Sequence, residues 1–304
     1  MGTGMTGRWS GRRALVTGAS SGVGLEIARA LAAGSAHVIL PVRDRSRGDA
    51  AMRSIRESVP DASLEVRDLD LADFASVAAL GKRLRAEGAP IELYVMNAGI
   101  ILLGDGERHV TVDGHELHLQ TNFLGHAALT RELMPLLCAG RARVAVQLSL
   151  AAARGRLDDL ECKRRYSAWR AYAGSKRALG LWGAELARRS AAEGWGLNVN
   201  LCHPGVAPDT GIAVGVRRRP KGGETGGRAQ LARRLGSTPA QAAEPALMAL
   251  ASDAGIGKFY VPGGTFGMSG APRERALFRA LRDADAARRM WEFAEMALTR
   301  GLAG

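Results

Sequence analysis

Short apolar segments alternate with longer helical segments along most of the chain, and no other feature of the sequence restricts the fold more. Runs of β-branched and apolar residues predict seven strands, at 13–16, 37–42, 63–68, 91–96, 144–148, 197–202 and 258–261. Apolar residues spaced three and four apart predict helices at 22–33, 47–58, 74–86, 116–137 and 172–191. Strands that alternate with helices form parallel βαβ units with right-handed crossovers. We therefore expect an α/β fold, with a doubly wound, mainly parallel seven-stranded sheet and helices on both faces.

The 304 residues lie near the upper length that one hydrophobic core supports, and 46% of them are hydrophobic. No internal repeat and no linker divides the chain, so we expect residues 1–304 to form a single domain. The segment RRRPKGGETGGR, at 217–228, combines glycine, proline and charge with almost nothing to bury. We interpret it as a mobile surface loop within that domain.

A net charge of +12 and a pI of about 10.5 raise the question of nucleic-acid, acidic-membrane or other anionic partners. Lysine and arginine are scattered along the chain, with local clusters at 163–165 and 217–221, and this distribution favours solvated helix faces. The sequence contains no recognised nucleic-acid-binding motif, and aromatic residues make up only 5% of it. We therefore expect a small-molecule ligand and no nucleic-acid partner.

The three cysteines, Cys138, Cys162 and Cys202, stand far apart and have no metal-ligand spacing. Such a sparse and odd-numbered set predicts reduced thiols, a cytoplasmic location and no metal site. The sequence also lacks any run of 18 or more apolar residues, so we expect no transmembrane segment.

A glycine-rich turn follows the first predicted strand and leads into the first predicted helix. Its sequence is TGASSGVG, at 17–24, with the glycines spaced G-xxx-G-x-G rather than G-x-G-x-x-G. Glycines let the backbone approach a pyrophosphate, and a helix N-terminus offers free N–H groups and a partial positive charge. The placement between a strand and a helix makes this turn a candidate dinucleotide site. The candidate contacts are Gly18, Ser20, Ser21, Gly22, Val23 and Gly24.

Arg43 and Asp44 follow the second predicted strand, at the position that distinguishes NAD from NADP. A site for NAD places an acidic residue there to accept a hydrogen bond from the ribose 2′-OH, whereas an arginine can grip the 2′-phosphate of NADP. Asp44 is the alternative ribose partner, but it stands one residue later and can instead pair with Arg45 or Arg47. We expect Arg43 to decide the choice and the cofactor to be NADP(H).

The ends of three further strands supply the remaining cofactor contacts. Asp70 is placed either near the adenine amino group or as the N-terminal cap of the next helix. The small residues at 97–99 allow a ribose to pack on the backbone, and the turn at 204–205 is expected to meet the nicotinamide. These candidates are Asp70, Leu71, Asn97, Ala98, Gly99, Pro204 and Gly205.

Tyr172 and Lys176 stand four residues apart in a predicted helix, so their side chains share one face. A tyrosine with the usual pKa of about 10 is a poor acid–base catalyst at neutral pH. A neighbouring ammonium lowers that pKa, so we expect Lys176 to activate Tyr172 and also to hold the nicotinamide ribose. Ser149 ends the fifth strand, where its hydroxyl can donate to a carbonyl oxygen. Asn122 is unfavourable inside a helix, which suggests a role in a water or lysine network.

Taken in order, these motifs resemble the short-chain dehydrogenase/reductase family. The matching motifs are TGASSGVG at 17–24, NAG at 97–99, Asn122, Ser149, YAGSK at 172–176 and PG at 204–205. Longer stretches are similar to its retinol-dehydrogenase-like branch, among them TVDGHELHLQTNFLGH at 111–126 and KRRYSAWRAYAGSK at 163–176. The resemblance implies a single-domain Rossmann fold and hydride transfer between NAD(P)H and a carbonyl or alcohol. It also implies that Ser149, Tyr172 and Lys176 form a catalytic triad, with Asn122 as a fourth member.

Two departures from the family pattern concern the substrate. Leu148 stands where the family often has a second serine, and the region 206–240, expected to hold the substrate loop, is diverged. Residues 270–304 form a C-terminal tail that either covers an oligomer interface or closes over the substrate. The resemblance therefore leaves both a homo-oligomer and a tail-covered monomer open.

We expect NADPH-dependent reduction of a ketone or aldehyde of a lipophilic small molecule, such as a secondary metabolite, with Tyr172 as the proton donor. The candidate substrate-lining residues, each of which ordinary packing also explains, are Leu150, Trp169, Phe266, Met268 and Trp291. The alternative is a non-catalytic dinucleotide sensor or regulatory protein. Proteins of that kind tend to lose the tyrosine or the lysine, and this chain keeps both.

Overall fold

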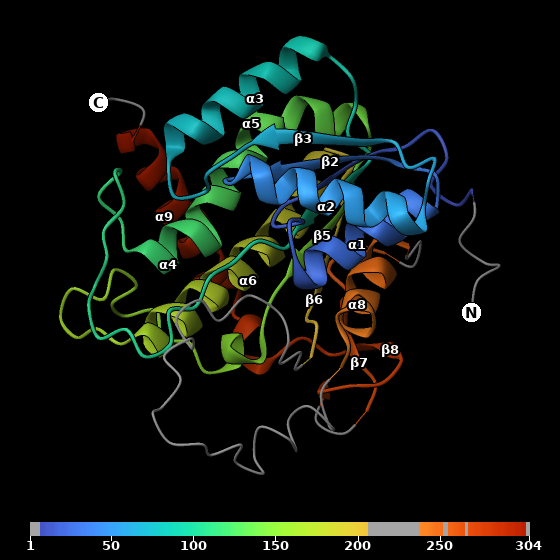
Figure 1. Cartoon of the computed structure of the whole chain (residues 1–304). Helices are drawn as coiled ribbons and strands as arrows, with labels where there is room; N and C mark the ends of the chain where they lie inside the picture. Colours follow the sequence, from blue (N-terminus) through green and yellow to red (C-terminus); the bar gives the residue numbers. More distant parts are fainter. Residues whose placement is uncertain (1–6, 206–236, 252–254, 265–266, 302–304) are drawn as a thin grey trace, which may run out of the picture.

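The computed structural model describes residues 7–205, 237–251, 255–264 and 267–301 (Figure 1). Its strands are β1 (Arg13–Val16), β2 (His37–Val42), β3 (Leu64–Asp68), β4 (Leu93–Met96), β5 (Arg143–Gln147), β6 (Asn198–Cys202), β7 (Phe259–Pro262) and β8 (Pro272–Arg275). Its longer helices are α1 (Gly22–Ala33), α2 (Arg45–Ser58), α3 (Phe74–Glu87), α5 (Gly125–Ala139), α6 (Ala168–Glu193), α8 (Pro239–Ala251) and α9 (Ala284–Gly301). The loop predicted at 217–228, and most of the region 206–240, lie outside the described residues.

The strands form one sheet in the order β3-β2-β1-β4-β5-β6-β7-β8. Neighbouring strands from β3 to β7 pair in parallel, and β8 pairs antiparallel with β7. The chain moves outward in one direction from β1 to β3 and in the other from β4 onward. A crevice therefore opens between β1 and β4 at the carboxyl ends of the strands, where open α/β sheets bind their ligands.

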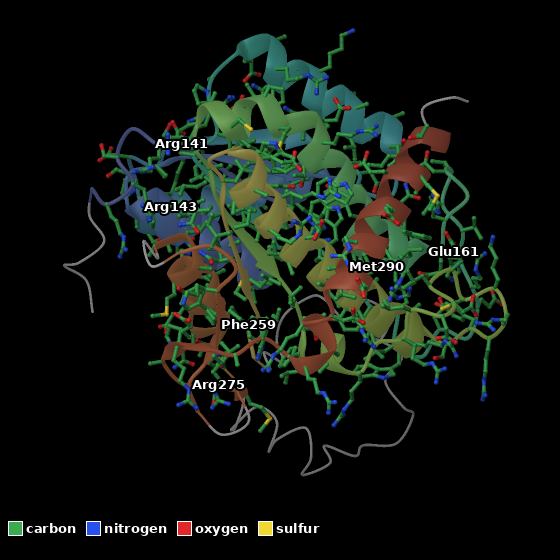
Figure 2. All side chains as sticks on the ribbon, turned by 180° about the vertical axis from the view of Figure 1, so that it is seen from behind. Arg141, Arg143, Glu161, Phe259, Arg275 and Met290 are labelled. Atoms are coloured by element: carbon green, nitrogen blue, oxygen red, sulfur yellow. The ribbon has the colours of Figure 1, made fainter. Side chains whose placement is uncertain are left out.

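The expected doubly wound, mainly parallel sheet is confirmed, but the expected number of seven strands is wrong by one. The missing strand is β8, whose sequence PRER contains no alternating apolar residues. It lies at the edge of the sheet, where Arg273, Glu274 and Arg275 are exposed; Arg275 is labelled in Figure 2. The opposite edge strand, β3, also carries charged residues, Glu65 and Arg67.

Each face of the sheet carries its own hydrophobic core. Residues of α1, α2 and α8 pack on one face, and residues of α3, α5 and α6 pack on the other. Figure 1 shows α1, α2 and α8 grouped together, with α3 and α5 on the far side of the sheet from them. Helices on both faces are thus confirmed. That residues 1–304 form a single domain stays a prediction.

The helix predicted at 116–137 is divided into three parts. A short turn, α4 (Leu117–Leu119), leads into a π-helical turn, η1 (Gln120–Leu124), and α5 follows without a break in the chain's course. A π turn accommodates one residue more than an α turn and often marks a functional site. Here it contains Asn122, which is fully buried.

The C-terminal tail ends in α9, which packs against α6. Trp291 of α9 stacks on Trp182 of α6, with ring centroids 5.7 Å apart and planes 8° from parallel. Arg189 lies over the same Trp291 ring, 4.6 Å from its centroid. Met290, labelled in Figure 2, is buried beside them in the core. No helix in the described part of the chain is long and apolar enough to cross a bilayer.

Candidate active site

A cavity of about 550 Å³ lies at the carboxyl ends of the central strands. Nearly all of the predicted site residues line it, although they come from seven separate parts of the chain. These residues are Gly18, Ser20, Ser21, Gly22, Val23, Gly24, Arg43, Asp70, Leu71, Asn97, Ala98, Gly99, Ser149, Tyr172, Lys176, Pro204 and Gly205. Asn122 is the one predicted site residue that lies behind the wall rather than in it.

The glycine-rich turn is held very close to the end of β4. Gly18 has a φ of +69°, and a Cβ there would lie 2.8 Å from the Cα of Ala98. A Cβ on Gly24 would lie 2.4 Å from the Gly18 carbonyl oxygen. Ser21, at the N-cap of α1, makes no side-chain capping hydrogen bond. The turn thus has no room for larger residues, and its helix N-terminus remains available to an anion.

Thr17, whose role the sequence analysis missed, ties this turn to β4. Its hydroxyl donates to the Val95 carbonyl at 3.2 Å and accepts from the amides of Asn97 and Ala98, both at 3.0 Å. The Asn97 side chain returns a hydrogen bond to the Thr17 carbonyl at 2.8 Å. One buried hydroxyl therefore fixes the spacing between two walls of the cavity.

At the far end of the cavity, four charged residues that follow β2 differ in role. Asp44 caps α2 by accepting from the Arg47 amide at 3.1 Å, and Arg45 pairs with Asp68 at 2.9 Å. Arg47 lines the cavity, with its guanidinium 3.4 Å from the Ser21 hydroxyl. Arg43 lines the cavity and is exposed. Asp44 is therefore occupied as a helix cap. The positive charge at this end of the cavity comes from Arg43 and Arg47.

Asp70 was predicted either to approach the adenine or to cap the next helix. The cap of α3 is Asp73, whose carboxylate accepts from the amides of Ala75 and Ser76. Asp70 accepts from the Ala72 amide at 2.9 Å and lines the cavity. The capping alternative for Asp70 is therefore wrong, and its carboxylate faces the cavity.

Ser149, Tyr172 and Lys176 meet at the other end of the cavity. Burial raises the pKa of Tyr172, and a hydrogen bond with the Ser149 hydroxyl opposes this rise. The structure does not show the expected lowering of the tyrosine pKa by Lys176: burial has the largest effect, and the opposing contribution comes from Ser149. Tyr172 is also in contact with a small apolar cluster that includes Ile101 and Ala151.

Lys176 is 1% exposed and donates to the Gln147 carbonyl at 3.1 Å. Burial lowers the pKa of this ammonium to about 8. Gln147, another residue that the sequence analysis missed, connects the two halves of the crevice, because its amide donates to Asn97 Oδ1 at 2.6 Å. A backbone carbonyl therefore holds the lysine at the ends of the strands. Because its pKa is about 8, its charge begins to be lost just above neutral pH.

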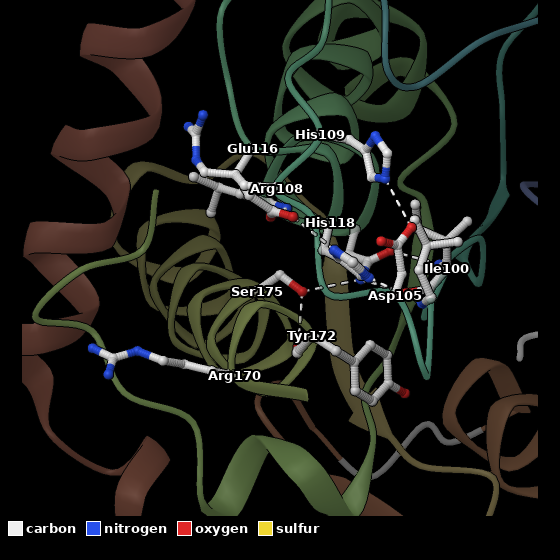
Figure 3. Close-up of polar contacts among 12 residues, drawn as sticks. Ile100, Asp105, Arg108, His109, Glu116, His118, Arg170, Tyr172 and Ser175 are labelled. Carbon is white, nitrogen blue, oxygen red and sulfur yellow. Dashed lines mark hydrogen bonds and ion pairs between the residues drawn. The ribbon is translucent and has the colours of Figure 1, made fainter. Parts of the chain in front are cut away.

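Asn122 is expected to join a water or lysine network, which stays a prediction, and in the structure its side chain makes three hydrogen bonds to protein groups (Figure 3). Its Oδ1 accepts from the Ile100 amide at 2.7 Å, while its Nδ2 donates to the Ile100 carbonyl and to Ser175 Oγ, both at 3.0 Å. Ser175 in turn donates to the Tyr172 carbonyl at 2.8 Å. The side chain of Asn122 thus links the catalytic helix α6 to the segment after β4.

His203 precedes the turn Pro204–Gly205 and holds it in place. The Gly205 amide donates to His203 Nδ1 at 2.9 Å, and burial lowers the pKa of this histidine to about 4, so it stays neutral. Gly205 has a φ of +79°, and a Cβ there would lie 2.3 Å from the Met268 carbonyl oxygen. Only glycine fits this position in the wall.

The predicted substrate-lining residues do not form the described wall of the cavity. Trp291 packs on α6, Trp169 is 50% exposed, with its ring 6.3 Å from that of Tyr172, and Phe266 lies outside the described residues. The apolar residues of the described wall include four that follow β4 or precede Ser149, namely Ile100, Ile101, Leu103 and Leu148. Leu150 and Met268 are likewise absent from it. The sequence did contain a signal for the residues at 100–103, namely their position directly after the NAG motif. A chain that leaves the carboxyl end of a central strand must border the crevice.

The chain belongs to the short-chain dehydrogenase family, whose model matches residues 12–220. It is 34% identical over 270 residues to a polyprenol dehydrogenase from Danio rerio, a match that covers 84% of this chain and 79% of that protein. It is 37% identical over 199 residues to retinol dehydrogenase 12 from Homo sapiens, covering 64% of this chain and 61% of that protein. The resemblance to the retinol-dehydrogenase-like branch is thereby confirmed.

Solved structures agree with this assignment. An uncharacterised protein from Mycobacterium paratuberculosis is similar over 98% of this chain and 97% of its own, with a TM-score of 0.76 and 31% identity. The RhlG–NADP active-site complex from Pseudomonas aeruginosa has a TM-score of 0.54 and 28% identity, and the match covers 66% of this chain and 75% of that one. The Rossmann-like fold and an oxidoreductase family that uses a nicotinamide dinucleotide are both established.

Proposed function

We propose that this protein is an NADPH-dependent reductase that converts a ketone or aldehyde of a lipophilic small molecule to the alcohol. The observation that carries the proposal is the meeting of Ser149, Tyr172 and Lys176 at one end of a cavity whose other end carries Arg43 and Arg47. A dinucleotide extended between the two ends would place its nicotinamide beside the tyrosine and its adenosine beside the arginines. NADPH supplies the hydride when it is bound.

The residues present fit this cofactor. The uncapped N-terminus of α1 can receive the pyrophosphate, and the glycines of the turn leave space for close approach. Arg43 and Arg47 can hold a 2′-phosphate by charge-assisted hydrogen bonds, while Asp44, the acidic residue that would suit NAD, is occupied as a helix cap. The NADP bound to the similar structure of RhlG supports the same choice.

Each catalytic group then has one task. Ser149 donates a hydrogen bond to the substrate carbonyl oxygen, and Tyr172 gives that oxygen a proton as negative charge develops on it. The positive charge of Lys176 stabilises the phenolate that remains, and Lys176 also holds the ribose, while water supplied through Asn122 returns a proton to Tyr172. The pKa of Tyr172 is raised, so its phenol is protonated at neutral pH, as the proton donor of a reduction must be.

The apolar residues Ile100, Ile101, Leu103 and Leu148 line the cavity, and Ile101 packs with Tyr172, which supports a lipophilic substrate. The names of the similar proteins, polyprenol and retinol dehydrogenase, refer to alcohols of the same character. The sensor alternative is disfavoured because the tyrosine and the lysine both face the cavity. The cytoplasmic location and the homo-oligomer stay predictions.

Calorimetric titration with NADPH and with NADH tests the cofactor assignment. We expect Arg43→Ala to weaken NADPH binding by about 10- to 100-fold, the effect of losing charge-assisted hydrogen bonds of about 1.5–3 kcal/mol, and to leave NADH binding unchanged. A screen of apolar carbonyl compounds follows, with Tyr172→Phe as the inactive control. Failure of the wild-type protein to bind either nucleotide would overturn the proposal.

A further inference from the structure

The segment Ile100–Leu103 borders the cavity but belongs to no helix or extended strand of the sheet. Ile101 packs against Tyr172, so the position of this segment determines the space left for a substrate beside the proton donor. Segments without regular backbone pairing are usually the most mobile parts of a protein. Ile101 forms an isolated β-bridge, so the neighbouring residues of the segment must be held by other means.

Two buried side chains accept hydrogen bonds from alternate amides of the segment. The Ile100 amide donates to Asn122 Oδ1 at 2.7 Å, and the Leu102 amide donates to His118 Nε2 at 3.1 Å. Both acceptor residues are fully buried. These two side chains accept hydrogen bonds from alternate amides, as the carbonyl groups of a neighbouring strand would in a sheet.

Glu116 sets the state of this histidine. Its Oε1 lies 2.7 Å from His118 Nδ1, its Oε2 accepts from the Leu119 amide at 2.7 Å, and its side chain is fully buried (Figure 3). Because the Leu102 amide points at Nε2, that nitrogen carries no proton, and Nδ1 is the donor to the carboxylate. Glu116 thereby selects the one imidazole tautomer that can accept from the wall segment.

Glu161 binds this pair to the loop that precedes α6. Its carboxylate accepts from the Glu116 amide at 2.9 Å and lies 2.7 Å from His115 Nδ1. Arg108 donates to the Glu161 carbonyl at 2.6 Å. The support of the wall thus extends, through consecutive hydrogen bonds, to the chain that leads into the helix carrying Tyr172.

We propose that the buried Glu116–His118 pair is a positioning device that fixes the wall segment Ile100–Leu103 and so determines which apolar carbonyl substrates reach Tyr172. The inference rests on the function proposed above and extends it to selectivity. Neither residue lines the cavity, so both act through the Leu102 amide. Substrate affinity depends on them, whereas cofactor affinity does not, because the dinucleotide turn has separate supports.

The test compares two replacements of the histidine in the full-length chain. In the double variant Glu116→Gln/His118→Phe, a ring of similar size remains, the Leu102 amide loses its acceptor and no unpaired carboxylate is left buried. In His118→Gln, the carboxamide can both accept from Leu102 and donate to Glu116. His109→Phe is the matched control, because His109 lies in the segment between β4 and α4 and also pairs with an acid, Asp105, but at an exposed position.

Three readouts are measured: amide hydrogen exchange at Leu102, the NADPH dissociation constant, and KM and kcat for hexanal and decanal. We expect the double variant to exchange Leu102 at least tenfold faster and to raise the decanal KM about five- to tenfold, with NADPH binding unchanged and kcat within about twofold. His118→Gln should recover most of both effects, and His109→Phe should match the wild type.

Unchanged exchange and unchanged KM in a folded double variant would overturn the proposal. Equal losses of kcat, KM and NADPH affinity in both His118 variants would also overturn it, since they would indicate general destabilisation. A wild-type protein that binds NADPH but reduces neither aldehyde would count against the proposed function. In that case Leu102 exchange alone decides whether the pair positions the wall.

Discussion

Replacing Trp291 with alanine tests whether the C-terminal tail is part of the core. The change removes a ring stacked on Trp182 at 5.7 Å, a second aromatic contact with Trp195 at 6.2 Å, and the surface over which Arg189 lies. Fully buried aromatic residues lose about 3–5 kcal/mol of stability on truncation to alanine, and Trp291 is partly exposed. Aromatic stacking contributes about 0.5–1.5 kcal/mol to stability, and a cation–π contact contributes about 0.5–1 kcal/mol.

We therefore expect Trp291→Ala to lower the free energy of unfolding by about 3 kcal/mol. For a chain of this length, that loss corresponds to a fall in Tm of about 5 °C. Urea and thermal unfolding, followed by far-UV circular dichroism, measure both quantities. Met296→Ala on the same helix is the control, because that side chain is 55% exposed and its loss should cost at most about 0.5 kcal/mol.

Equal unfolding midpoints for Trp291→Ala and Met296→Ala would refute this reasoning. They would mean that α9 contributes little to the core and is free to act elsewhere, as the lid over the substrate that the sequence left open. A lid would also reveal itself in the kinetics, since the tryptophan variant would then change the KM of a carbonyl substrate without a change in stability. We expect the opposite, because Trp291 lies outside the described wall of the cavity.

Two other perturbations test the ends of the cavity. Gly24→Ala places a Cβ 2.4 Å from the Gly18 carbonyl oxygen, so we expect the NADPH dissociation constant to rise at least tenfold in calorimetric titration. Gly106→Ala is its control, because a Cβ at Gly106 meets nothing within 4 Å, and an equal effect of the two variants would exclude local crowding as the cause. Lys176 has its pKa lowered to about 8, so its ammonium form prevails below that pH and is lost above it. Carbonyl reduction at saturating NADPH should therefore be constant near pH 7 and fall about tenfold per pH unit above pH 8; a rate that rises through pH 9 would contradict this assignment.

The parts of the fold and site that the sequence predicts well are those where one local rule decides the outcome. Buried central strands such as β1 are apolar because helices cover both faces, and the glycine-rich turn is recognisable because close backbone approach excludes larger residues. The cap of α3 was less certain, since Asp70 and Asp73 are both suitable and only the backbone path selects Asp73.

The parts that the sequence does not predict depend on contacts between distant segments. Glu116 and His118 stand in a predicted helix, and nothing in the neighbouring sequence indicates that they support the cavity wall. The contact with Leu102 exists only because the fold brings the two segments together. From the sequence, Trp291 was a candidate for the lipophilic pocket, but in the structure its ring stacks on Trp182 of α6. The raised pKa of Tyr172 likewise follows from burial, a property of the packed molecule that the i,i+4 spacing with Lys176 does not reveal.

The charged residues on the two outermost strands have a consequence for how copies of this molecule can meet. An open sheet has two rows of backbone N–H and C=O groups without a strand partner, and such rows invite strands from other molecules. At one edge Pro272 lacks an N–H and is followed by three charged residues, and at the other Glu65 and Arg67 stand on β3. Adding a strand at either edge would bring charges together or remove them from water. In the described part of the chain, both edges of the sheet therefore disfavour edge-to-edge aggregation.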